Sequence, residues 1–113
     1  MAVAEIAKAW GKEIIIINNN LYAGKLLLID KGAYSSIHSH REKDETFYCV
    51  EGGVLLVVED KAHWLRPGAD PIRIKPGQRH MFVGVAKSKL IEVSTEDKNG
   101  DTVRLTKSRP ASV

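Results

Sequence analysis

The sequence predicts an all-β protein, either a sandwich or a barrel. Many short apolar segments have the length of strands, turns containing Gly or Pro separate them, and no window of helical length shows a clean 3.6-residue period. The 113 residues are 43% hydrophobic and 27% charged, which is typical of a globular domain. We therefore predict a single domain over residues 1–113, with a core of about 12–106 and a C-terminal tail, 107–113, that frays.

The N-terminal part contains the clearest strand signal. Residues 14–17 are four consecutive isoleucines, whose branched side chains favour a pleated strand over a helix. Three asparagines, residues 18–20, follow and tolerate the left-handed backbone of a turn. An apolar pattern resumes over 21–29, so residues 12–29 predict a β-hairpin. The preceding residues 2–10 are rich in Ala and predict a short turn of helix.

The remaining strands are predicted from shorter patterns. Gly52-Gly53 and Pro76-Gly77 separate several of them. Asn99-Gly100 is a dipeptide typical of hairpins, so it predicts a hairpin that ends in the last strand. The predicted strands after the first hairpin span residues 34–40, 45–50, 54–58, 62–65, 72–74, 80–85, 90–94 and 102–105.

Charge and composition exclude several classes of partner. Lys and Arg number 17 against 14 Asp and Glu, and an excess of +3 is too small and too scattered for a nucleic-acid protein. The longest apolar runs, 14–17 and 26–29, are too short to span a membrane. The single Cys49 cannot form an internal disulfide, and the N-terminus shows no apolar signal-peptide region. We expect a cytoplasmic protein with no nucleic-acid or membrane partner.

A group of histidines predicts a metal site. His38 and His40 are separated by one residue on a predicted strand, so both rings lie on one face with Cα atoms roughly 6.5 Å apart. Two such imidazoles can bind one ion at about 2.0–2.1 Å. Glu45 lies beside them if residues 41–44 reverse the chain, and His80 opens a later strand where a fourth ligand can enter. The alternative is a His-x-His pair that occurs by chance on a surface strand.

The chemistry of these residues restricts the ion. Neutral imidazoles and one carboxylate suit Zn, Mn, Fe, Ni, Co or Cu better than Mg or Ca, which prefer oxygen ligands. The expected cofactor is therefore one divalent transition metal. Four protein ligands on an octahedral ion leave two positions for substrate. Such an ion can polarise a carbonyl, lower the pKa of water, or hold a deprotonated diol.

The segment that carries these residues resembles the first motif of the cupins. That motif has a glycine, five residues, His-x-His, three or four residues, a glutamate, six residues and a second glycine. Gly32, His38, His40, Glu45 and Gly52 occupy every fixed position. The resemblance implies a double-stranded β-helix, or jelly-roll barrel, with the metal inside the barrel mouth.

The second cupin motif is matched less closely. The family pattern is P-x-G-x-x-H with an asparagine four residues after the histidine. This chain has Pro76-Gly77-Gln78-Arg79-His80, which is one residue tighter, and Gly84 stands in place of the asparagine. The resemblance covers about residues 12–95 and implies His80 as the fourth ligand. Small cupins of this kind are usually dimers, so it also implies a homodimer.

A narrower resemblance concerns function. Trp10-Gly11, the Ile-rich strand and residues 90–94 are similar to the cupin domain of type II phosphomannose isomerases. This implies a sugar or sugar-phosphate isomerase or epimerase in which the metal stabilises an enediolate. Glu92 is the candidate catalytic proton carrier if it faces the lumen, and a surface residue otherwise. The alternatives are an Fe-dependent dioxygenase and a non-enzymatic small-molecule-binding cupin.

Four further residues are candidates for the substrate pocket. Phe47 and Phe82 lie near the ligands in sequence and either wall the cavity or fill the barrel. Tyr34 can present its hydroxyl to a sugar if it points inward. Arg79 either holds a phosphate or carboxylate or belongs to a solvated basic face. The expected partner is a small substrate that is sugar-like or a carboxylate.

Overall fold

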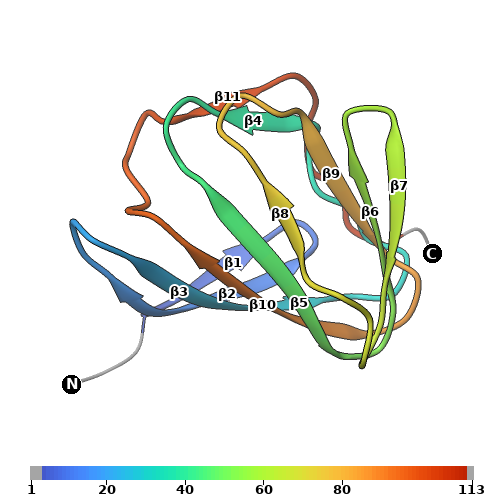
Figure 1. Cartoon of the computed structure of the whole chain (residues 1–113). Helices are drawn as coiled ribbons and strands as arrows, with labels where there is room; N and C mark the ends of the chain where they lie inside the picture. Colours follow the sequence, from blue (N-terminus) through green and yellow to red (C-terminus); the bar gives the residue numbers. More distant parts are fainter. Residues whose placement is uncertain (1–3, 112–113) are drawn as a thin grey trace.

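Two antiparallel sheets curve around a common interior in the computed structural model, which describes residues 4–111 (Figure 1). The six-stranded sheet has the order β1-β2-β3-β10-β5-β8, and the five-stranded sheet has the order β11-β4-β9-β6-β7. The described residues contain no helix, so the predicted all-β class is confirmed. The strands are β1 Ala4–Lys8, β2 Gly11–Asn18, β3 Ala23–Ile29, β4 His38–His40, β5 Glu45–Glu51, β6 Val54–Val58, β7 Lys61–Leu65, β8 Ile72–Ile74, β9 His80–Gly84, β10 Ser88–Ser94 and β11 Thr102–Arg104.

The core lies between the two sheets and follows strand alternation. In β3 every second residue is buried, and β5 and β10 repeat this pattern over most of their length. Successive strand residues face opposite sides, so one side of each strand lines the interior. Most of these inward positions are apolar, and the core they form includes Leu27, Ile29, Phe47, Cys49, Leu56 and Leu90. The same alternation points three charged residues of these strands, Lys25, Glu45 and Glu92, toward the interior.

The first hairpin is confirmed and the helical turn before it is wrong. β2 pairs with β3 in antiparallel register. In the turn between them, the Asn19 side chain accepts hydrogen bonds from the backbone amides of Leu21 and Tyr22 at 2.8 and 2.9 Å. Residues 4–8 form β1, a strand that pairs with β2. Ala has little β preference of its own, but the free edge of β2 offers a full set of backbone partners. Residues 2 and 3 lie outside the described part of the chain.

The Asn99-Gly100 turn does not close a hairpin. β11 follows it but pairs with β4 in the opposite sheet, so the chain crosses between sheets here. The reason is that β10 already pairs with β3 on one side and β5 on the other, which leaves it no free edge. The dipeptide predicts a local turn correctly, but which strand it serves depends on the sheet order.

Two glycines allow close packing near the sheet ends. Gly52 has φ of +83°, and a Cβ there would lie 2.4 Å from the carbonyl oxygen of Lys87. At Gly84 a Cβ would lie 2.5 Å from the carbonyl oxygen of Asp30. Gly84 is the position where the family pattern has asparagine. Here the close approach of the chain after β3 leaves no space for a side chain.

The C-terminal segment returns to the body of the protein. The backbones of Arg109 and Tyr34 exchange two hydrogen bonds of 2.8 and 3.0 Å, and the Ser108 hydroxyl accepts one of 3.0 Å from the amide of Ser36. These contacts involve part of the tail, residues 107–113, that we expect to fray; its last two residues lie outside the described part. Over residues 4–111 the structure has no helix long and apolar enough to cross a membrane.

Candidate metal centre

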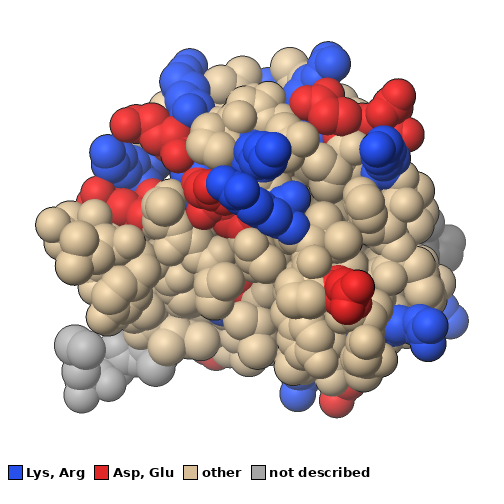
Figure 2. All heavy atoms as spheres, viewed as in Figure 1, with Lys and Arg blue, Asp and Glu red and all other residues tan. Residues whose placement is uncertain are grey.

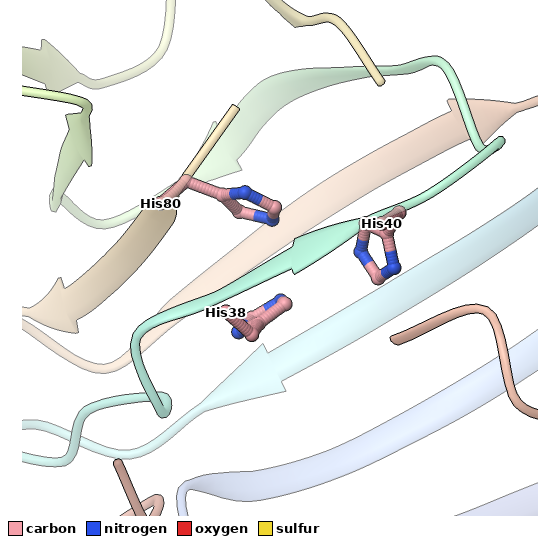
Figure 3. Close-up of side chains that lie close together, drawn as sticks. All are labelled: His38, His40 and His80. Atoms are coloured by element: carbon pink, nitrogen blue, oxygen red, sulfur yellow. The ribbon is translucent and has the colours of Figure 1, made fainter. Parts of the chain in front are cut away.

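Three histidine rings converge at one end of the barrel interior (Figure 3). His38 and His40 come from β4, and His80 begins β9 directly opposite His38 in the register of the two strands. One nitrogen from each ring lies within 4.8 Å of the others. The rings of His38 and His80 are closest, with centroids 4.3 Å apart. The structure thus joins the two sequence segments on which the predicted site depends.

Each ring is held by a contact at its other nitrogen. The Nδ1 of His38 lies 2.9 Å from the carbonyl oxygen of Ser36, and that of His80 lies 3.0 Å from the carbonyl oxygen of Gln78. A carbonyl only accepts, so both Nδ1 atoms carry the proton and both Nε2 atoms offer a lone pair. The Nδ1 of His40 lies 3.1 Å from the Thr102 hydroxyl. Such outer contacts orient imidazoles for an ion.

Glu45, the first residue of β5, lies beside two of the three rings. Its Oε2 lies 3.0 Å from Nε2 of His40 and 3.5 Å from Nε2 of His80. Even so, Oε2 of Glu45 and Nε2 of His80 are buried with no hydrogen-bond partner among the described residues. Buried polar atoms are rarely left unpaired. Atoms bound at about 2.1 Å to one ion at right angles are about 3 Å apart, so these residues fit a divalent transition metal.

The protonation states also suit a cation. Burial, followed by the charge of His80, lowers the pKa of His38 to about 3. Burial likewise lowers the pKa of His80, although Glu45 opposes this. For Glu45, burial alone favours the neutral acid, but the contact with His40 and the charge of Lys43 outweigh it and lower the pKa. Neutral imidazoles and an ionised carboxylate are the forms that bind metals.

A second carboxylate stands near the first. Glu92 lies on β10 at a position that faces inward, and it is only 5% exposed. Its Oε2 accepts a 3.0 Å hydrogen bond from Nζ of Lys43. Burial, and then the negative charge of Glu45, raise the pKa of Glu92, whereas Lys43 and Lys25 oppose the rise. The structure thus places Glu92 in the lumen, which is the first of its two sequence-based alternatives.

Two buried lysines link these acids into a network. Besides Glu92, Nζ of Lys43 lies 3.9 Å from Glu45 and 3.6 Å from Asp97. Lys25 on β3 pairs with Asp97 and, at 3.1 Å, with Glu13. Sequence reasoning did not identify Lys43, and for Lys25 it left open which way the side chain points. The available signal was the position of Lys25 in β3, where it shares the inward face with apolar residues.

A cavity of about 350 Å³ opens onto the metal centre. The predicted pocket residues Phe47 and Phe82 line it, with Trp10, whose ring packs edge-on against Phe82 at 5.1 Å. Tyr34 and Arg79 do not line this cavity. Both lie outside the strands, each beside a buried residue, Ser35 and His80 respectively. Arg79 is exposed beside Glu59, over a separate hollow.

The far wall of this cavity contains residues that sequence reasoning missed. Thr102 and Arg104 stand on β11 opposite His40 and His38, and Thr106 follows with the same alternation. Arg104 donates a 2.9 Å hydrogen bond to the Ser36 hydroxyl. The two-residue alternation of residues 102–106 can be read from the sequence. The strand that pairs with β11 cannot, because that strand, β4, lies far away in the chain.

Comparison with known proteins agrees with this fold. The family model described as "Cupin domain" matches residues 25–94, which is more than half of the chain. The chain therefore belongs to the cupin family. No curated protein sequence gives a significant match.

Solved structures of low sequence identity share the fold. KdgF from Halomonas sp. superposes with a TM-score of 0.72 at 21% identity, over 78% of this chain and 80% of that one. A variant of Streptomyces PAC13 with uridine gives 0.77 at 13%, over 97% and 87%. Oxalate decarboxylase from Bacillus subtilis gives 0.80 at 14%, over 91% of this chain but only 30% of its own length. Another structure of that decarboxylase concerns its Mn(II) centres.

Proposed function

We propose that this protein is a metal-dependent isomerase or epimerase of a small sugar or sugar phosphate. The observation that carries the proposal is the position of Glu92, a buried carboxylate in the wall of the cavity that the metal centre occupies. Isomerisation needs a group that removes a proton from one carbon and returns it to a neighbouring atom. An inward carboxylate near a cation-binding site supplies that group.

His38, His40, Glu45 and His80 are the proposed ligands of the ion. A bound divalent metal supplies Lewis-acid stabilisation of negative charge on adjacent substrate oxygens. Histidines and one carboxylate suit Zn, Mn, Fe, Ni, Co and Cu. The protein contributes the ring orientations, fixed by the Nδ1 contacts of the three histidines.

Glu92 is the proposed proton carrier. Its pKa is raised toward neutral pH, and a catalytic base works best when its pKa is near the operating pH. The Lys43 ammonium, 3.0 Å away, holds one carboxylate oxygen and keeps the ionised form accessible. The proton taken from the substrate carbon resides on Glu92 until it is returned to the neighbouring carbon. Phe47, Phe82 and Trp10 form apolar walls that limit the entry of water to this region.

The test is proton exchange at C2 in heavy water. The metal-loaded protein is incubated with a panel of aldoses and aldose phosphates, and deuterium incorporation and ketose formation are followed by NMR. We expect turnover with exchange, and a loss of about 100- to 10,000-fold in Glu92→Gln with metal content unchanged. Glu51→Gln is the control, because Glu51 is exposed at the other end of β5. An inactive panel, or an unaffected Glu92→Gln, contradicts the proposal.

The same preparation separates the alternatives. Substrate-dependent oxygen uptake by an iron-loaded protein would replace the isomerase with a dioxygenase. A ligand-induced rise in melting temperature without turnover would indicate a binding module.

A cytoplasmic homodimer is also proposed. Ile14, Leu26, Ile91 and Tyr48 follow one another across four strands on the outer face of the six-stranded sheet. Figure 2 shows charged side chains gathered in the upper part of the view and few over its lower part, where β2, β3 and β10 lie in Figure 1. Light scattering on the wild type and on Ile91→Glu measures the mass; a monomeric wild type contradicts the dimer.

The cytoplasmic location is supported by the single cysteine, Cys49, which is free and buried.

A further inference from the structure

The cavity contains two groups of cations that differ in their pairing. Lys25 and Lys43 lie deep and are paired with carboxylates. Lys8, Arg104 and Lys107 also line the cavity, with Lys8 half-buried and the other two exposed, so they mark its solvent side. Among the ion pairs of residues 4–111, none involves these three. The opening therefore carries positive charge that the protein does not neutralise.

Arg104 is the best placed of the three. It stands opposite His38 in the β4–β11 register, so both side chains leave the same face of the sheet. One of its nitrogens donates to the Ser36 hydroxyl at 2.9 Å, and that hydroxyl lies 3.1 Å from Nδ1 of His38. This is the only side-chain hydrogen bond of Arg104 within the described residues. A guanidinium has five N–H donors, so most of them stay available.

The charge balance of the lining points the same way. It includes five lysines and arginines against four carboxylates, before a divalent ion adds two positive charges. An uncharged polyol would leave this excess uncompensated at the cavity opening. A substrate with a negative group would neutralise it, and a forked guanidinium matches a carboxylate or a phosphate with two parallel hydrogen bonds.

We propose that the cavity selects an anionic substrate, a carboxylate or phosphate of a small polyol, whose negative group is bound by Arg104 with Lys107 and Lys8 around it. The inference rests on the proposed function only in taking this cavity as the substrate site. It gives Arg104 the anion-binding role that the sequence suggested for Arg79. All three cations lie outside the matched family segment, residues 25–94, so this selectivity belongs to the parts of the chain that flank it.

The test compares six-carbon polyols that differ in the group at one end of the chain, which is neutral in sorbitol and negatively charged in the other two. Gluconate, sorbitol and sorbitol 6-phosphate are titrated calorimetrically into metal-loaded protein of measured metal content. We expect at least one anion to bind about 10- to 100-fold more tightly than sorbitol, because charged hydrogen bonds contribute that much. The anion that gains more tells whether the site prefers a carboxylate or a phosphate. Equal binding of all three overturns the proposal.

Variants separate Arg104 from the metal, which can itself bind a carboxylate. Arg104→Gln is expected to lose most of the anion preference while its metal content and sorbitol affinity stay unchanged. Arg79→Gln is the matched control, since Arg79 is an exposed arginine outside the cavity. Unchanged anion affinity in Arg104→Gln overturns the proposal. Anion selectivity without turnover would instead retain this inference and contradict the isomerase.

Discussion

The hydroxyl of Thr102 lies 3.1 Å from Nδ1 of His40, across the β4–β11 pair. The contact joins the last strand of the chain to the metal centre, and it orients a ring whose other nitrogen faces Glu45. We expect Thr102→Val, which keeps the shape, to weaken metal binding about tenfold, as loss of an outer contact does. Competition with a chromophoric chelator measures this. Thr46→Val on β5 is the control, and equal affinities in the two variants would contradict the role.

The histidine cluster predicts a sharp dependence on residue position. Replacing His38, His40 or His80 by Ala removes one ligand and should lower metal affinity by more than the roughly 10- to 100-fold effect of an outer-contact mutation. His63 on β7 lies outside the cluster, so His63→Ala should bind metal as the wild type does. Elemental analysis after dialysis provides the measurement. Full metal content in all four variants would rule out this centre.

Lys43 should be essential for stability because three carboxylates share its charge. Lys43→Met leaves Glu92 and Glu45 buried without their nearest cation, and removing one partner of a buried pair typically costs about 3–5 kcal/mol. Lys89→Met, which removes an exposed ion pair with Glu51, should cost less than about 1 kcal/mol. Urea unfolding gives both values. Similar losses in the two variants would contradict the importance of the buried network.

Two glycines with nearly the same backbone should respond differently to Ala. Gly52 and Gly77 have φ of +83° and +84°. A Cβ at Gly77 meets no atom within 4 Å, so Gly77→Ala should cost only the strain of a left-handed backbone, about 1–2 kcal/mol. Gly52→Ala adds a collision with the chain at Lys87 and Ser88 and should cost about 1–3 kcal/mol more. Thermal unfolding distinguishes them; equal melting temperatures would show that the backbone near Gly52 yields freely.

The metal-free protein should lose stability in acid. The pKa of His38 falls from about 6.5 when unfolded to about 3 when folded. A depressed pKa contributes stability that is present above pH 6.5 and is lost as the pH falls toward 3, at roughly 1.4 kcal/mol per pH unit at most. Unfolding of chelator-treated protein between pH 7 and pH 4 tests this. His38→Gln should show a shallower decline, and an identical decline would assign the effect to other groups.

Local sequence patterns predict much of the barrel. The isoleucine run and the asparagine turn lead to the β2–β3 hairpin, and the spacing of His38 and His40 places both rings on one face. The failures have a common cause. The first residues form a strand because β2 has a free edge, and the last strand leaves its neighbour because β10 has none. Whether a neighbouring strand has a free edge cannot be read from the local sequence of the segment that pairs with it.

By itself, the sequence determined the strand class, the family motif and the residues able to hold a metal, because these depend on the period of two and on ligand chemistry. Only the tertiary structure decided that Glu92 faces the lumen, that Lys25 and Lys43 are buried among acids, and that Arg104 rather than Arg79 lines the cavity. The physical reason is that these features depend on pairings between strands far apart in the chain, such as β4 with β11 and β9.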